Sequence, residues 1–421
     1  MSDDGGESAR RAIEAWAASG AMSLTGRADG PPLGPPEPLV PGLSAIADVV
    51  AQRSSALGSP VRLDPLGLLS ERAAIAGLHR QGTTSCGGAT RLLPCADGWF
   101  AVSLARDDDL ELVPAWLGIP ALGGADPWAV VAGEVECRRG ATLVEQAALL
   151  GLPVSELPAA VPDAPVARAP LAPLPCRARR FGDRTAATAL EGVVVVDLGS
   201  LWAGPLCGSI LADAGAAVVK VESTGRPDGA RQGPAAFFDL LNAGKRSVAL
   251  DLRNERGRRL LAALLARADV VIEASRPRAL EQLGVDAAAL LGQADGPRVW
   301  CSITGHGREG SARDRVGFGD DAAVAGGLVT WEDGAPRFCA DAAADPATGL
   351  TAAAAVLDAL AAGGTWLLDV ALAGVAAHLA GPTLPVPADV VAAPAAARRV
   401  RGHAAALGAD TAAVLAELGL A

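Results

Sequence analysis

The chain has 421 residues, of which 50% are hydrophobic, and this length is sufficient for two domains with a large core. Its formal net charge is −11 at pH 7, which argues against a nucleic-acid partner because phosphate binding needs a basic field. The sequence has no hydrophobic run of membrane-spanning length and no signal-peptide core at its start, so we expect a cytoplasmic protein without a membrane partner. Its seven cysteines lack C-x-x-C spacing, and we expect neither a disulfide framework nor a metal site.

The first part of the chain combines two patterns. Residues 8–80 have a mostly helical pattern that is interrupted by glycine and proline. Residues 91–106 are predicted to form a β-hairpin that turns at Ala96-Asp97-Gly98. We therefore expect a smaller α+β domain in this part of the chain.

A segment rich in proline, alanine and arginine divides the sequence. Residues 158–184 have this composition and are predicted to form neither helix nor strand. We therefore assign residues 161–188 to a linker, residues 1–160 to a small-domain-like segment and residues 189–421 to a large domain.

Short hydrophobic strands alternate with helical patterns after this linker. The predicted strands are Val193–Leu198, Ala217–Glu222, Ser247–Leu252, Val270–Glu273 and Val299–Thr304. The predicted helices are Pro205–Ala214 and Glu255–Arg267. This alternation predicts an α/β domain with a doubly wound parallel sheet and right-handed crossovers.

Cations gather where a parallel sheet binds its ligand, outside the carboxyl ends of the strands. The two lysines of the chain both lie in this region, with several arginines near predicted strand ends. These residues are Lys220, Arg226, Arg231, Lys245, Arg246, Arg276 and Arg278. Such a cluster in an acidic protein indicates a small, highly anionic ligand, although solvated loop charges are the simpler explanation for any one of them.

The loop Gly199–Pro205 follows the first predicted strand and leads into a helix, whose N-terminus is suited to bind phosphate. It lacks the G-x-G-x-x-G spacing of a dinucleotide site, which weakens an NAD hypothesis. Glu222 ends the next strand and could hold a ribose hydroxyl, so that alternative stays open.

The chain also contains an internal repeat. Gly42-Leu-Ser-Ala-Ile matches Gly349-Leu-Thr-Ala-Ala, and flanking glycines agree in order. Four residues before the shared glycine stands Pro38 in the first copy and Asp345 in the second. Chance agreement is the competing explanation in a chain this rich in alanine and glycine.

Several motifs follow one another in the second half. They are Leu201-Trp-Ala-Gly-Pro-Leu-Cys207, Leu211–Glu222, Asn242–Leu252, Ser302-Ile-Thr-Gly-His-Gly307 and Leu407–Gly419. In this order they resemble the family III CoA-transferases, the CaiB/BaiF or formyl-CoA transferase-like group. The resemblance covers residues 190–421 almost completely. Residues 13–160 resemble the latter half of the same family, so the usual order of segments is rearranged.

The resemblance implies a Rossmann-like large domain that uses coenzyme A as a substrate, with no permanently bound cofactor. The residues expected at the coenzyme are Trp202, Ala203, Gly204, Lys220, Arg226, Lys245, Arg246, Arg276, Arg278 and Gly305. The implied partners are an acyl-CoA and a small carboxylic acid. Family members form interlocked homodimers, which implies a homodimer here, although the rearranged order conflicts with the interlocking.

The resemblance also implies that Asp345 is a nucleophile. A carboxylate in a site that excludes water can attack a thioester, forming an anhydride and then an aspartyl-CoA thioester from which CoA passes to an acceptor acid. The expected function is therefore CoA transfer. The alternative explanation for Asp345 is that it caps a helix beginning near Pro346.

Two other functions stay open. The α-methylacyl-CoA racemases share the fold, but the histidine of their proton-transfer pair is replaced here by Phe318, with Asp320 and Asp321 nearby. A non-catalytic CoA-binding protein is the second alternative, because the first repeat copy lacks the aspartate. In some family members glycines close over the intermediate, and Cys86-Gly87-Gly88 stands near the corresponding place.

Overall fold

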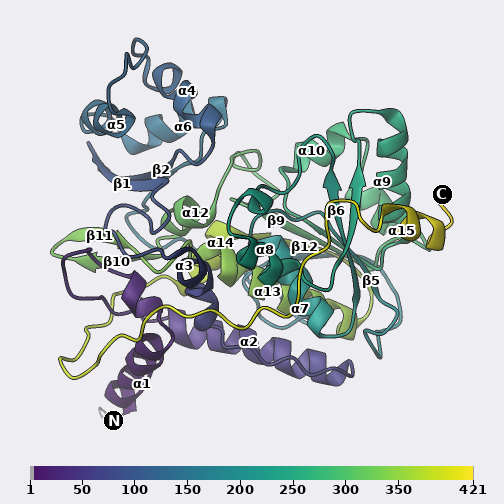
Figure 1. Ribbon diagram of the computed structural model, residues 1–421. Coiled ribbons are helices and arrows are strands. Elements are labelled where there is room, and N and C mark those ends of the chain that lie inside the picture. The colour runs from purple at the N-terminus through teal and green to yellow at the C-terminus, as the bar shows by residue number, and fades with distance from the viewer. Residues whose placement is uncertain (1–3, 421) are drawn as a thin grey trace.

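The structure, a computed structural model, describes residues 4–420 (Figure 1). A seven-stranded sheet with its helices forms a large α/β part, and a small α+β part, drawn in blue, lies at one end of the molecule. The C-terminal segment, drawn in yellow, crosses the front of the molecule from the N-terminal helices toward the sheet. Within residues 4–420, no helix combines the length and the apolar character that a membrane crossing requires.

The large sheet has the strand order β4-β12-β9-β8-β5-β6-β7. Its strands are β4 (Arg177–Gly182), β5 (Val194–Asp197), β6 (Ala217–Ser223), β7 (Arg246–Leu250), β8 (Val270–Glu273), β9 (Val299–Thr304) and β12 (Thr365–Ala371). Neighbouring strands pair in parallel from β12 to β7, and β4 joins β12 in the antiparallel direction. The strand order reverses between β5 and β8, so the crevice expected for a ligand lies outside the carboxyl ends of these two strands.

Helices cover both faces of this sheet, which confirms the predicted doubly wound α/β fold. The helices are α7 (Ala203–Asp213), α8 (Ala235–Asn242), α9 (Glu255–Arg267), α10 (Pro277–Gln282), α11 (Ala287–Leu291), α12 (Gly319–Ala325), α13 (Ala344–Ala362), α14 (Leu372–Leu379) and α15 (Thr411–Glu417). One hydrophobic core joins α7 and α13 to one face, and a second core joins α9, α11 and α15 to the other. The parallel strands are almost wholly buried between them, as their runs of valine and isoleucine predict.

The predicted elements after residue 190 are confirmed with small shifts of their ends. The helix Glu255–Arg267 and the strands Val270–Glu273 and Val299–Thr304 have the predicted bounds. The prediction that residues 158–184 form no strand is wrong, because β4 lies within them. An arginine-rich edge strand needs a neighbour for its hydrogen bonds, and β12 supplies them from a part of the chain far away in sequence.

The N-terminal segment packs on the large part. It forms α1 (Asp4–Ala18), α2 (Leu39–Ala56) and α3 (Glu71–Ala76). Helix α2 lies along α13, and Leu43 and Ile46 share one hydrophobic core with Leu350 and Leu357. The large core is therefore built by both halves of the chain.

The two matched segments of the predicted internal repeat lie in α2 and α13, helices of 18 and 19 residues. Pro38 is the N-cap residue of α2. The chain returns over this end of the helix, where the Glu37 amide donates to the Pro382 carbonyl oxygen at 2.8 Å and Pro36 pairs with Thr383. The place in the first copy that corresponds to Asp345 is thus covered by the chain itself.

The small part has its own hydrophobic core. Its strands are β1 (Thr90–Cys95), β2 (Gly98–Ser103) and β3 (Val154–Glu156), and its helices are α4 (Asp107–Leu117), α5 (Pro127–Val135) and α6 (Gly140–Leu150). The predicted hairpin is confirmed, since Cys95 pairs with Gly98 across the turn. Phe100 and Trp116 meet edge to face in the core. Strands β2 and β3 contact α12, which brings the small part next to the N-terminus of that helix.

The segment after α14 is extended until α15 and ties the N-terminal helices to the sheet. Arg398 forms an ion pair of 3.1 Å with the buried Glu71 of α3. Further along, the Ala404 amide donates to Asp239 of α8 at 2.8 Å. These contacts fix α3 against the large part, and α3 carries a residue of the candidate site.

Candidate functional site

Asp345 is the second residue of α13 and lies against the first residue of α12. The Gly319 amide lies beside its carboxylate and lowers its pKa, and a Cβ atom at position 319 would come 2.4 Å from Asp345 Oδ2. The alternative explanation, that Asp345 caps a helix beginning near Pro346, is wrong, because the N-cap residue is Ala343 and no side chain caps this end. The carboxyl group instead lies between the N-terminal ends of two helices, where their dipoles favour a negative charge.

Asp345 belongs to a cluster of carboxylates with unusual protonation. Burial raises its pKa from an ordinary 3.8 to about 7, and Asp320 and Asp341 add to this effect while Arg72 opposes it. Burial likewise raises the pKa of Asp320 to about 6 and that of Asp321 to about 7. As a whole residue, Asp345 is of intermediate exposure. Perturbed pKa values grouped in this way are typical of functional sites.

Arg72 of α3 joins the site from the N-terminal segment. Its Nε and Nη2 atoms lie 2.9 and 2.5 Å from the two carboxylate oxygens of Asp341, which is fully buried. Its guanidinium group also lies over the ring of Trp202, 5.3 Å from the centroid. Arg72 therefore connects the loop before α13 with the loop before α7.

The loop before α13 has a strained backbone. Ala340 and Ala342 have φ angles of 55° and 46°, which L-residues with a side chain rarely adopt. Side chains from distant segments hold them there: the Ala340 amide donates to Thr25 at 3.0 Å and the Ala342 amide to Asp320 at 3.2 Å. A strained loop fixed from several sides directly before Asp345 fits a site whose carboxylate must be precisely oriented.

The loop between β5 and α7 lies at the carboxyl edge of the sheet, as predicted. The side chains of Lys220 and Lys245 support it. Lys220 Nζ lies 2.9 Å from Asp228 and donates to the Gly199 carbonyl oxygen at 2.8 Å. Asp228 accepts a hydrogen bond of 2.9 Å from the amide of Leu201, whose φ angle of 67° is also left-handed.

Lys245 supports the other end of this loop. Its Nζ atom lies 2.8 Å from Asp197 and donates to the Pro205 carbonyl oxygen at 2.7 Å. Asp197 in turn accepts from the Gly199 amide at 2.8 Å. Both lysine side chains are almost fully buried, so their positions favour support of the loop over the direct ligand contact that we expected.

Trp202, Ala203 and Gly204 are buried where α7 begins. A Cβ atom at Gly204 would come 2.8 Å from the Gly199 Cα atom, so the loop closes tightly on itself. A Cβ atom at Gly349 of α13 would come 2.7 Å from the Ala203 carbonyl oxygen. This close approach of α7 and α13 places the loop beside the end of α13 that carries Asp345.

Four arginines face one another at the carboxyl edge of the sheet. Burial lowers the pKa of Arg276, and the positive charges of Arg278, Arg106 and Arg226 lower it further. Arg226 follows β6, Arg276 and Arg278 follow β8, and Arg106 is the N-cap residue of α4 in the small part. The structure thus brings three of the expected cations together and adds Arg106, whose guanidinium group is also paired with the buried Asp109. The guanidinium group of Arg106 lies 5.9 Å from the Phe318 ring, next to Gly319, which links this cationic rim to Asp345.

Other expected residues lie elsewhere. Arg246 begins β7 at the amino edge of the sheet and pairs with Glu417 of α15. Gly305 directly follows β9 at the carboxyl edge and packs against Gly317 of the same loop, where a Cβ atom at position 305 would come 3.0 Å from the Gly317 Cα atom. Glu222 is bound by Arg231, with its Oε2 atom 2.6 Å from Arg231 Nη2, so the carboxylate that would suit the NAD hypothesis already has a partner.

The sequence reasoning missed Arg72, Asp341 and Arg106. Arg72 and Arg106 are remote from Asp345 in sequence, and no local pattern joins them to it. Asp341 stands four residues before Asp345, and this pair of aspartates was the one available signal. The Cys86-Gly87-Gly88 loop does reach the site, since a Cβ atom at Gly87 would lie 3.5 Å from Arg72 Nη2.

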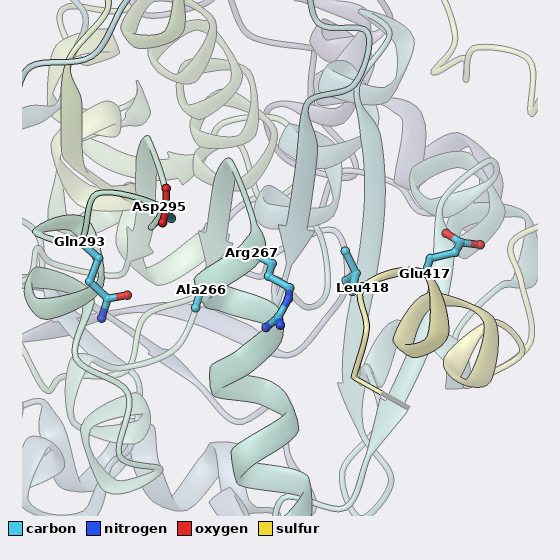
Figure 2. A pocket seen from close by; sticks show the side chains of 6 residues that line it. All are labelled: Ala266, Arg267, Gln293, Asp295, Glu417 and Leu418. Atoms are coloured by element: carbon cyan, nitrogen blue, oxygen red, sulfur yellow. The ribbon is translucent and has the colours of Figure 1, made fainter.

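A pocket of about 640 Å³ lies at the opposite edge of the sheet (Figure 2). Its lining comes from the end of α9, the loop before β9 and α15, and includes Arg267, Asp295 and Glu417. Figure 2 shows these three side chains spread apart rather than directed at one point. Glu417 is held by Arg246, so the pocket does not assemble a set of convergent polar groups.

The fold and the site define an α/β protein with a carboxylate of raised pKa at the ligand-binding edge of a parallel sheet, beside a rim of arginines. The sequence profile of CoA-transferase family III matches residues 190–409, just over half of the 421-residue chain. The chain belongs to CoA-transferase family III, and the resemblance found in its sequence is confirmed.

Relatives of this family align with part of the chain. The succinyl-CoA:glutarate CoA-transferase of Mus musculus is 36% identical over 186 residues, which cover 41% of this chain and 41% of that protein. The succinyl-CoA–D-citramalate CoA-transferase of Chloroflexus aurantiacus is 36% identical over 146 residues, covering 33% of this chain and 36% of that protein. A crystal structure of a CaiB/BaiF family protein from Brucella suis is 37% identical with a TM-score of 0.41, covering 45% of this chain and 54% of that one. The chain thus spans less than two thirds of the length of each of them.

Proposed function

We propose that this protein is a CoA-transferase that moves coenzyme A from an acyl-CoA thioester to a free carboxylic acid, with Asp345 as the nucleophile. The observation that carries the proposal is the position of Asp345, at the meeting of two helix N-termini and beside the loop that follows β5. The raised pKa of about 7 supports it, because a poorly hydrated carboxylate is more reactive than one in water and still ionises near neutral pH.

The first half of the reaction transfers CoA to the protein. An Asp345 oxygen attacks the thioester carbonyl carbon, the carbon–sulfur bond breaks, and an acyl-aspartyl anhydride and CoA thiolate form. The thiolate then attacks the aspartyl carbonyl carbon and expels the donor acid, which leaves an aspartyl-CoA thioester. The Gly319 amide is in place to donate to oxygen charge that develops at this group.

The second half runs the same steps in reverse with a different acid. The acceptor carboxylate attacks the aspartyl-CoA thioester and releases the thiolate, which then attacks the acceptor acyl carbon. The new acyl-CoA leaves and the Asp345 carboxylate is restored. No proton needs to move between the reacting atoms, so each step depends on orientation and on the exclusion of water.

The cationic rim supplies the binding site for the coenzyme in this proposal. Coenzyme A carries a pyrophosphate and a 3′-phosphate, and Arg226, Arg276, Arg278 and Arg106 provide positive charge for them. Arg106 belongs to the small part and the other three to the large part. The coenzyme would therefore bridge the two parts, with its thioester end directed past Phe318 toward Asp345.

A panel of acyl-CoA donors and free acids tests the proposal, with new thioesters separated and quantified by chromatography. We expect transfer between one donor and one acceptor by the wild type and none by Asp345→Asn. Asp295→Asn is the control, because this exposed residue lies at the opposite edge of the sheet. Tight binding of coenzyme A without transfer to any acid would contradict the proposal and favour the non-catalytic alternative.

A further inference from the structure

We propose that Arg72 is the positioning residue of this site, holding the loop of residues 340–342 and orienting the Asp345 carboxyl group from a segment more than half the chain away. The inference deepens the proposed function and rests on it in one respect, that Asp345 is the group to be oriented. It also implies that the N-terminal segment supplies, through Arg72, a residue needed by a site that otherwise lies in the region matched by the family profile.

The geometry of the Arg72–Asp341 pair fixes the loop of residues 340–342. Both oxygens of the buried Asp341 are bound by one guanidinium group, at 2.9 and 2.5 Å. A bidentate pair of this kind fixes direction as well as distance. Asp341 lies between Ala340 and Ala342, the two strained residues, so the pair holds the loop at the point where its backbone is least favourable.

The loop of residues 340–342 sets the position of Asp345. The Asp345 amide donates to the Ala342 carbonyl oxygen at 2.8 Å, so the conformation of Ala342 sets the start of α13 and the direction of the Asp345 side chain. The Ala342 carbonyl oxygen also lies against Gly319, where a Cβ atom would come within 2.6 Å of it. If the loop relaxed, the contact between Asp345 and the Gly319 amide would be lost with it.

Arg72 also offsets the negative charge around Asp345. The charged groups near Asp345 are Asp320 and Asp321 of α12, Asp341 of the preceding loop and Arg72 of α3, and the uncharged Trp202 before α7 contacts Arg72. Arg72 is thus the cation among several carboxylates. Its removal would leave Asp341 buried without a partner and would raise the pKa of Asp345 further, because the negative neighbours would act unopposed.

Two substitutions and one matched control test the inference. Arg72→Met removes the charge and the bidentate pair, and Arg72→Lys keeps a charge but not the planar fork. Arg53→Met is the control, since Arg53 also pairs with a buried aspartate, Asp358, at 2.7 Å on another side of α13. Circular dichroism establishes whether each variant folds. If Arg72→Met does not fold, the comparison is made with Arg72→Lys instead.

The first readout is the rate at which an acyl-CoA modifies Asp345, measured from pH 5 to pH 9. We expect Arg72→Met to be slower by about 100-fold at pH 7, as for other misplaced reacting groups, with its acid limb moved to higher pH by about one unit or more. Arg72→Lys should lie between Arg72→Met and the wild type, and Arg53→Met should match the wild type. A wild-type rate and pH profile in Arg72→Met would overturn the inference.

The second readout does not depend on catalysis. Carboxyl carbon resonances of ¹³C-labelled aspartate, with the Asp345 signal assigned by its absence from Asp345→Asn, report the titration directly. If the wild type forms no adduct with any acyl-CoA, the proposed function fails, and the titration still decides the inference. We expect a higher midpoint in Arg72→Met, and an unchanged midpoint would contradict the role of Arg72.

Discussion

Gly319 and Asp345 come from the first turns of two helices and meet so closely that position 319 has no room for a side chain. A Cβ atom there would lie 2.4 Å from Asp345 Oδ2 and 2.6 Å from the Ala342 carbonyl oxygen. The Gly319 amide meanwhile lies beside the Asp345 carboxylate and lowers its pKa. The glycine is therefore required by the position of the carboxyl group rather than by its own backbone.

Gly319→Ala is expected to displace the Asp345 side chain and to reduce transfer by about 100-fold, the loss typical of a displacement near 1 Å. The fold should persist, because the clash involves the end of one side chain and one loop. The control is Gly133→Ala on α5, where nothing lies within 4 Å of an added Cβ atom. Steady-state transfer rates measure the effect, and an unchanged rate in Gly319→Ala would show that the contact does not matter.

The pH dependence of activity and of stability should run in opposite directions. Burial raises the pKa of Asp345 from 3.8 to about 7, so transfer should increase as the pH rises through this value and the carboxyl group ionises. The folded protein keeps a proton that the unfolded chain releases above its ordinary pKa, so the free energy of unfolding should fall as the pH rises from 3.8 to about 7 and then stay level.

Asp345→Asn should therefore be more stable than the wild type at pH 8, by roughly 1–3 kcal/mol, while it loses transfer. Urea unfolding at pH 5 and pH 8 measures this, with Asp295→Asn as the surface control. Equal stability of Asp345→Asn and the wild type at both pH values would mean that the carboxyl group is not perturbed by folding.

Lys245→Met is expected to destabilise the fold. The substitution leaves Asp197 buried without its nearest cation, and such a loss typically lowers the free energy of unfolding by about 3–5 kcal/mol. Arg259→Met, which breaks an exposed pair with Glu255, should lower it by less than about 1 kcal/mol. Denaturant unfolding compares the two, and a small effect of Lys245→Met would argue against the supporting role that its burial indicates.

Arg276→Gln should weaken coenzyme binding without weakening the fold. Loss of one phosphate contact is expected to raise the dissociation constant of an acyl-CoA by roughly 10-fold, and the salt dependence of binding should fall. Comparison with dephospho-CoA by titration calorimetry tells whether Arg276 faces the 3′-phosphate, since in that case the substitution would not affect the shorter ligand. Equal affinity of wild type and Arg276→Gln for both ligands would remove Arg276 from the site.

The sequence predicts five of the seven strands of the large sheet, because these five are short hydrophobic runs between helical patterns, but it does not predict β12 or β4. The strand β4 escapes prediction, because its arginines and the prolines before it suggest a linker and only β12 explains the pairing. The residues of the candidate site divide in the same way, into those that a local motif predicts and those that it does not. Asp345 and the arginines after β6 and β8 follow from local motifs, whereas Arg72 reaches Asp341 across 269 positions of sequence.

The two lysines show what charge alone does not reveal. Their position near strand ends suggests contact with an anionic ligand, but the sequence does not show which acids lie beside them. Asp228 and Asp197 bind the two ammonium groups inside the protein, at 2.9 and 2.8 Å, and leave the ligand edge to arginines. The sequence alone does not distinguish a buried cation that pairs with an acidic side chain from an exposed cation that binds a ligand.

The most direct test of the account is mass spectrometry of the protein after incubation with an acyl-CoA and hydroxylamine. Hydroxylamine converts an aspartyl anhydride or thioester into a stable hydroxamate at the modified residue. The account predicts a hydroxamate on the Asp345 peptide of the wild type, dependent on acyl-CoA and absent from Asp345→Asn. Transfer of CoA without modification of Asp345, or with modification of a different carboxylate, would contradict it.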